Sequence, residues 1–140
     1  MSLVATLYLL TAVAAVVIVL TRLRLRPRGD EGGAEVGGLI VTLHTLNGAA
    51  AVLTWLVFLS VATMTEVDPA LIGVISLGFW WVTGAIGLLL LLRFLPASTG
   101  RHAVAADHPG VGGFVLALIG HGGLCVIVLV FSWAYTLSKV

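Results

Sequence analysis

The sequence predicts an all-α integral membrane protein, a bundle of four transmembrane helices that run up and down in turn. Hydrophobic residues make up 60% of its 140 residues and charged residues only 9%, whereas a soluble domain carries roughly 25% charged residues. The charged residues are clustered, and each of the four intervals between the clusters exceeds the ~18 apolar residues that cross hydrocarbon. Because the connections are short, consecutive helices should be antiparallel neighbours in one domain, residues 1–140.

The composition also excludes several classes of protein. The mean hydropathy of +1.18 leaves too little polar surface for a soluble enzyme or a disordered chain. The single cysteine, Cys125, permits no internal disulfide, which excludes a disulfide scaffold. The net charge of +1 gives no basic patch for nucleic acid.

The first helix is expected near residues 2–21 and the second near residues 37–62, each within an uncharged interval. The first is not expected to be a cleaved signal, because its flanking basic residues follow the apolar run instead of preceding it. The two are separated by a glycine-rich turn around residues 28–33.

The third helix is expected near residues 70–94. Asp68 is a plausible N-cap for it, and Pro69 suits the first helical position. Trp80 and Trp81 fall near its middle. Adjacent side chains on a helix point about 100° apart, so at most one of these rings faces the bundle centre.

The fourth helix is expected near residues 110–137. Trp133 and Tyr135 near its end fit an aromatic belt at the membrane interface. The loop at 95–109, between the third and fourth helices, is the longest that we expect on the cytoplasmic side.

The distribution of basic residues predicts the orientation. Six of the seven lie after the first helix or around the loop between the third and fourth helices: Arg22, Arg24, Arg26, Arg28, Arg93 and Arg101. The positive-inside rule makes that side cytoplasmic and places both termini on the outer side. The strong Ala, Val, Leu and Gly bias is typical of a bacterial protein, so we expect a multi-pass protein of the bacterial inner membrane.

Chemistry within the predicted spans is restricted to a few groups. None of the four spans carries Asp, Glu, Lys or Arg deep within it, which argues against an ion-coupled transporter. Ser76 and Ser132 have no base beside them in sequence, and there is no Walker-type loop or Cys-x-x-Cys motif. Catalysis by this chain alone is therefore not expected.

Two histidines are the ionisable groups that remain within the spans. His44 lies about seven residues into the second helix and His121 about ten residues into the fourth, or roughly 10 and 15 Å deep. These helices run in the same direction and should lie on a diagonal of the bundle. Two imidazoles at matched depth on facing helices are what a six-coordinate b-type haem needs, so both are candidate metal ligands.

The neighbours of the two histidines complete the candidate cofactor site. Gly48 and Gly120 are small enough to leave room for a flat macrocycle. Asn47, with Thr42 and Thr45, could accept the second ring N–H of His44, and Trp55 shares its helical face. A quinone is a second candidate ligand for a bundle of this kind.

A structural interpretation of the same residues needs no cofactor. Each histidine could form a hydrogen bond between helices, and the glycines could serve close helix packing. His102, His108 and Asp107 in the long loop form a weak metal pattern, for which ordinary interfacial residues are the simpler explanation. A contact with a haem propionate or a quinone head group is a further alternative for His102 and His108.

In general plan the sequence resembles small membrane-anchor and b-type cytochrome subunits of respiratory complexes. The likeness is carried by His44 within Leu-His-Thr-Leu-Asn-Gly and by His121 within Gly-His-Gly-Gly. We therefore expect a small subunit of a membrane electron-transfer complex, surrounded by lipid and other integral membrane subunits. The alternative is a cofactor-free accessory subunit of a larger assembly, and a small transporter is a third, less favoured hypothesis.

Overall fold

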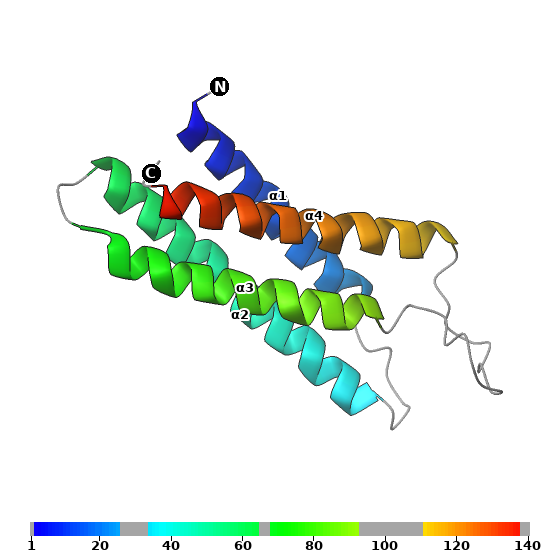
Figure 1. Ribbon diagram of the computed structural model, residues 1–140. Helices are drawn as coiled ribbons and strands as arrows, with labels where there is room; N and C mark the ends of the chain where they lie inside the picture. The colour runs from blue at the N-terminus through cyan, green and yellow to red at the C-terminus, as the bar shows by residue number, and fades with distance from the viewer. Residues whose placement is uncertain (1, 26–33, 65–67, 93–110, 138–140) are drawn as a thin grey trace.

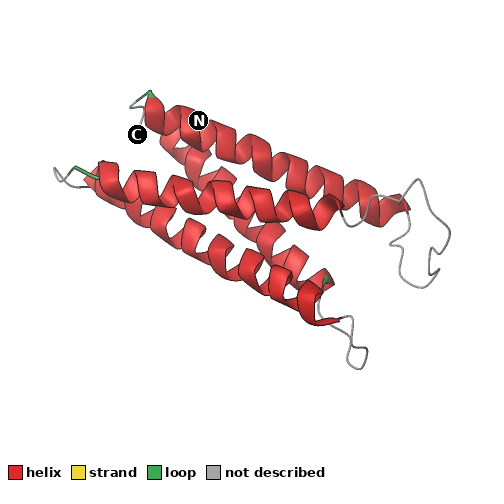
Figure 2. Cartoon of the chain, turned by 60° about the horizontal axis from the view of Figure 1, so that its bottom comes forward, coloured by secondary structure: helices red, strands yellow, loops and turns green. Residues whose placement is uncertain are grey.

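The computed structural model describes residues 2–25, 34–64, 68–92 and 111–137, and all the regular structure in these ranges is helical (Figures 1 and 2). In chain order the four helices are α1 (Leu3–Arg24), α2 (Ala34–Met64), α3 (Ala70–Leu92) and α4 (Val111–Thr136). Each is long and apolar enough to cross a membrane. The shortest, α1, has 22 residues, which gives a length of about 33 Å against roughly 30 Å of hydrocarbon. The chain is thus a helical protein of the multi-pass membrane type.

The helix bounds agree with the predicted spans to within three residues wherever the ends are described. The difference reaches three residues at the start of α2, which begins at Ala34 instead of 37, and at the end of α1, which continues through Arg22 to Arg24 instead of ending at residue 21. A helix need not end where hydrocarbon ends, because basic side chains extend from its last turn into the interface and complement the helix dipole.

Side-chain caps account for two of the helix starts. The Ser2 hydroxyl accepts a hydrogen bond from the Ala5 N–H, 3.2 Å away, at the start of α1. At the start of α3 the Asp68 carboxylate accepts one from the Ala70 N–H at 2.8 Å, which confirms Asp68 as the cap. Each satisfies an amide that the helix itself leaves unpaired.

The helices form an up-down bundle in which neighbours in sequence are neighbours in space. Over the described residues α1 contacts α2 and α4, and α3 contacts the same two helices, whereas neither diagonal pair has backbones in contact. Helix direction alternates along the chain, so the start of α1 and the end of α4 lie at the same end of the bundle (Figure 1). The diagonal relation of α2 and α4 agrees with the sequence-based expectation.

Each helix buries a narrow stripe and exposes the rest of its apolar surface. On α1 the buried positions recur every three or four residues: Leu7, Thr11, Ala14, Ile18 and Thr21. Large apolar side chains such as Leu46 and Ile119 point outward. In water this arrangement would aggregate, whereas hydrocarbon solvates it. On α3 the Trp80 ring is fully buried and Trp81 is 53% exposed, which agrees with the expectation that only one of them faces the centre.

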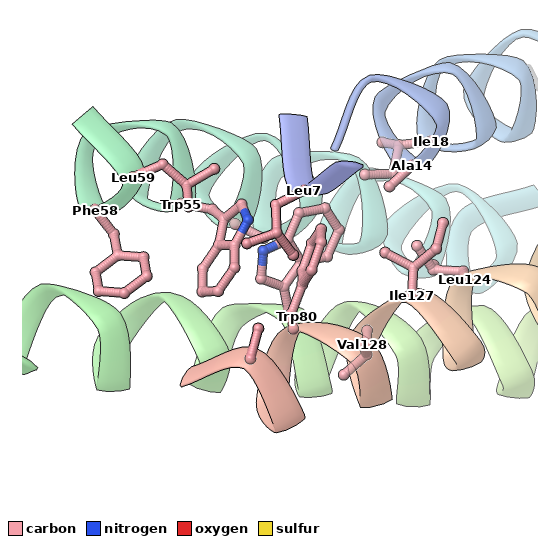
Figure 3. Close-up of a cluster of buried hydrophobic side chains, with 13 residues drawn as sticks. Leu7, Ala14, Ile18, Trp55, Phe58, Leu59, Trp80, Leu124, Ile127 and Val128 are labelled. Carbon is pink, nitrogen blue, oxygen red and sulfur yellow. The ribbon is translucent and has the colours of Figure 1, made fainter. Parts of the chain in front are cut away.

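The interior contains an aromatic cluster near the end of the bundle where the chain termini lie. Trp55 stacks on Phe131 with ring centroids 4.5 Å apart, and Trp80 meets the same ring edge-on at 5.2 Å. Phe58 completes the cluster, and Leu7 of α1 lies beside the two indoles (Figure 3). Further along, the core continues with smaller aliphatic side chains toward the histidines.

Candidate functional site

The two histidines of the predicted spans meet in the interior of the bundle. His44 comes from α2 and His121 from α4, the diagonal pair of helices, and their ring centroids are 6.0 Å apart with the ring planes inclined by 37°. His44 is 0% exposed and His121 is 6% exposed. Neither ring is turned toward the outer surface, and the two face each other at one level of the bundle.

The ring nitrogens are largely without partners. Nδ1 of His121 lies 2.9 Å from the Ala117 carbonyl oxygen one turn earlier in α4. For this contact to be a hydrogen bond, Nδ1 must carry the proton, which leaves a lone pair on Nε2. Among the described residues, Nε2 of His121 and both nitrogens of His44 have no hydrogen-bond partner. The Thr83 backbone lies beside the His44 ring, but not in the geometry of a hydrogen bond.

The expectation that His44 donates a hydrogen bond to Asn47, Thr42 or Thr45 is therefore wrong. Asn47 donates instead to α3, to the Phe79 carbonyl at 2.8 Å and to the Thr83 hydroxyl at 2.7 Å. The hydroxyl of Thr45 donates to the carbonyl of Val41 in its own helix. Asn47 cannot serve His44 because the two side chains point in different directions. Asn47 is three residues further along α2, on a neighbouring face of the helix, and that face packs on α3.

Thr42, the third candidate partner, is also engaged elsewhere. Its hydroxyl oxygen accepts a hydrogen bond of 2.9 Å from Nη1 of Arg22 on α1. The cofactor-free interpretation, in which His44 pairs with a threonine or an asparagine, thus lacks its hydrogen bond. An unpaired polar group in such an interior is costly.

Gly87 of α3 is a site residue that the sequence analysis did not identify. A Cβ at this position would stand 2.7 Å from Cδ2 of His121 and 3.4 Å from Cε1 of His44. Only glycine lets α3 approach both imidazoles so closely. A signal was present in the sequence, because small residues recur along the buried face of α3, interrupted by Trp80: Gly73, Ser76, Thr83, Gly84 and Gly87.

The glycines predicted to flank the histidines face α1. A Cβ on Gly48 would lie 2.8 Å from Cδ1 of Ile18, so this glycine permits close packing of α1 on α2. A Cβ on Gly120 would lie 3.6 Å from Cγ1 of Val17, an ordinary contact. Both glycines are near the rings in sequence, but the contacts that define their surroundings are with α1.

Trp55 belongs to the aromatic cluster and not to the immediate surroundings of the histidines. It is eleven residues beyond His44 on α2, or roughly 16 Å along the helix axis. Its Nε1, like that of Trp80, is buried without a hydrogen-bond partner among the described residues. His44 and Trp55 are both buried on α2, but the separation along the helix keeps this ring away from a ligand centred between the histidines.

The remaining candidate metal residues, His102, Asp107 and His108, lie outside the described residues. Within the described ranges no three His, Cys, Asp or Glu side chains are grouped in a way that could hold a metal ion. Two imidazoles are therefore the donor set that the bundle interior presents.

Comparison with known proteins found no match to a family model, to a curated protein or to a solved structure.

Proposed function

We propose that this chain is a small multi-pass subunit of a bacterial membrane electron-transfer complex, in which His44 and His121 are the two axial ligands of a b-type haem. The observation that carries the proposal is the inward-facing pair of imidazoles, 6.0 Å apart between ring centroids, with three ring nitrogens unpartnered among the described residues. When bound, the haem supplies a one-electron couple of its iron.

The distance between the rings is compatible with one metal between them. A bond from a metal to an imidazole nitrogen is about 2 Å long, so two imidazoles on opposite sides of one ion have ring centroids roughly 6 Å apart. The donor count also favours haem over a metal ion held by protein alone. A porphyrin supplies four further nitrogens, whereas two histidines leave the usual tetrahedral metal site half empty.

The residues around the rings have definable tasks in such a site. The Ala117 carbonyl fixes the tautomer of His121 so that Nε2 carries the lone pair that would bind the iron of a haem. Gly87 lets α3 pass close to both rings, where any larger residue would press on them. Asn47 and Thr83 join α2 to α3 close to His44 and hold that helix in register.

The remaining parts of the proposal follow from charge and exposure. Arg22 and Arg24 close α1 at the end of the bundle opposite to the termini, which the positive-inside rule makes cytoplasmic. The outward apolar surface, with Trp81 and Trp133 half exposed, suits lipid and other integral membrane subunits. A quinone is a candidate electron partner, because it shares the same hydrocarbon phase.

A cofactor-free accessory subunit is the alternative, and the aromatic cluster favours it. Trp55, Trp80 and Phe131 are 0% exposed and pack without any ligand, so the bundle has a core of its own. In that case the histidines are passive, and their replacement should change neither the spectrum of the protein nor its assembly with larger subunits.

The haem content of the purified protein distinguishes the haem-binding subunit from the cofactor-free accessory subunit. The full chain would be produced in haem-replete cells, purified in mild detergent and assayed for haem as the pyridine complex. We expect about one haem per chain and a Soret band for the wild type, and loss of the haem in His44→Ala and in His121→Ala. Thr45→Val is the matched control, since the hydrogen bond that its hydroxyl makes within the described part of the chain stays inside α2. Wild-type protein without a Soret band would reject the haem.

A further inference from the structure

Arg22 is a cation that reaches from the end of α1 onto a neighbouring helix. Its side chain is half-buried, and Nη1 donates a 2.9 Å hydrogen bond to the hydroxyl of Thr42 on α2. Arg24, two residues later, is exposed. A guanidinium has five N–H donors, and among the described residues this single bond is the one recorded for Arg22.

The helix register brings this guanidinium close to the level of the histidine pair. Thr42 precedes His44 by two residues on α2, or about 3 Å of helical rise. Deeper in the bundle, Ile18 of α1 packs on Gly48 of α2, so the two helices are antiparallel and in contact on either side of His44. Along the axis of α2, Arg22 therefore lies between the level of the imidazoles and the nearer end of the bundle.

A haem bound between the imidazoles would bring two carboxylates with it. Carboxylates in a hydrocarbon-facing bundle must reach water or a cation, because an unpaired buried charge is strongly unfavourable. The spans offer no lysine, and Arg22 is the arginine that the structure places half-buried beside α2, two residues from a proposed ligand. Its planar fork also matches a carboxylate with two parallel N–H bonds.

We propose that Arg22 binds a propionate of the haem and so fixes which edge of the macrocycle faces the Arg-rich end of the bundle. This inference rests on the proposed haem function, and it assigns Arg22 the role of a cofactor-binding residue. Thr42 holds the guanidinium in place before the haem arrives.

The test compares two forms of the cofactor that differ only in their carboxylates. Haem-free full chain, in nanodiscs of phosphatidylcholine, is titrated with ferric protohaem and with its dimethyl ester, and growth of the Soret band gives each Kd. Charge-assisted hydrogen bonds are strong enough that the wild type should prefer the free acid about tenfold or more. Arg22→Gln should bring the preference close to one, and Arg22→Lys should restore part of it.

Arg24→Gln is the matched control, since it removes the same charge from an exposed position of the same helix turn. Equal preference in the wild type and in Arg22→Gln, or an equal loss in Arg24→Gln, would overturn the role of Arg22 while leaving the haem in place. Nanodiscs with phosphatidylglycerol add a further arm: loss of the wild-type preference there would show that Arg22 binds lipid phosphate instead. Failure of both haems to bind would overturn the haem function itself, and this inference with it.

Discussion

Gly87 lies directly against His121: a Cβ added to this glycine would stand 2.7 Å from Cδ2 of the imidazole. Real Cβ atoms do not approach a ring so closely, so any side chain here must displace the ring or the helix. The same added atom would stand 3.4 Å from Cε1 of His44. Gly87 is therefore the position at which α3 packs against both histidines.

Gly87→Ala should therefore weaken both the fold and the site. We expect a destabilisation of about 1–2 kcal/mol from overpacking, since the methyl group costs more than the helix gains from alanine. Haem content should fall with it. Gly84→Ala is the control, because no heavy atom lies within 4 Å of its added Cβ, and it should be stabilised by up to about 1 kcal/mol. Unfolding in mixed micelles measures both, and equal stability of the two variants would contradict the packing described.

Asn47 is expected to act as a link between α2 and α3. Asn47→Leu removes hydrogen bonds of 2.8 Å to Phe79 and 2.7 Å to Thr83, each worth about 0.6 kcal/mol on average in a membrane protein. We expect a loss of about 1 kcal/mol in the same unfolding assay. Thr45→Val, which removes a hydroxyl bonded within one helix, should change stability by much less, and an equal loss would remove the special role of Asn47.

Phe131 is expected to be the most sensitive position of the aromatic cluster. It stacks on Trp55 and meets Trp80 edge-on, so Phe131→Ala leaves a cavity bounded by two indoles. The expected cost is about 3 kcal/mol. Leu129→Ala on the outer face of α4, where the side chain is 56% exposed, should cost less than about 0.5 kcal/mol. Similar costs at the two positions would show that the cluster does not form the core.

His44 should show opposite effects with and without its cofactor. In haem-free protein both of its nitrogens are buried without partners among the described residues, so His44→Leu should leave stability unchanged or raise it. With haem present, the wild type should gain stability by mass action while the variant does not. Melting curves with and without added haem measure this crossover. A variant that is less stable than the wild type in the haem-free state would indicate a structural role for the imidazole.

The sequence was sufficient to predict the four helices and the close approach of the two histidines. Long uncharged intervals define spans by their length, and short connections make consecutive helices antiparallel neighbours, so α2 and α4 run in the same direction on a diagonal. The levels of His44 and His121 then follow from their positions within the spans. The cap at Asp68 was predictable for a similar reason, because it depends on residues adjacent in sequence.

The residues around the rings could not be predicted in the same way. Asn47 is adjacent to His44 in sequence but bonds to α3, and Gly87 comes from a helix whose rotation no single-helix pattern specifies. Helices that are apolar on every face give little periodic signal for their inward side. Only the small-residue stripe of α3 carried that information, and its contact with the imidazoles required the packed bundle.

The most direct test of the central claim asks whether one iron takes both imidazoles. The reduced, purified protein would be exposed to carbon monoxide while its Soret band is recorded. A haem held on both sides by His44 and His121 should leave the band of the wild type unchanged, because neither side of its iron is open to the gas. A wild type that binds carbon monoxide at once, or that carries no haem to begin with, would contradict the account.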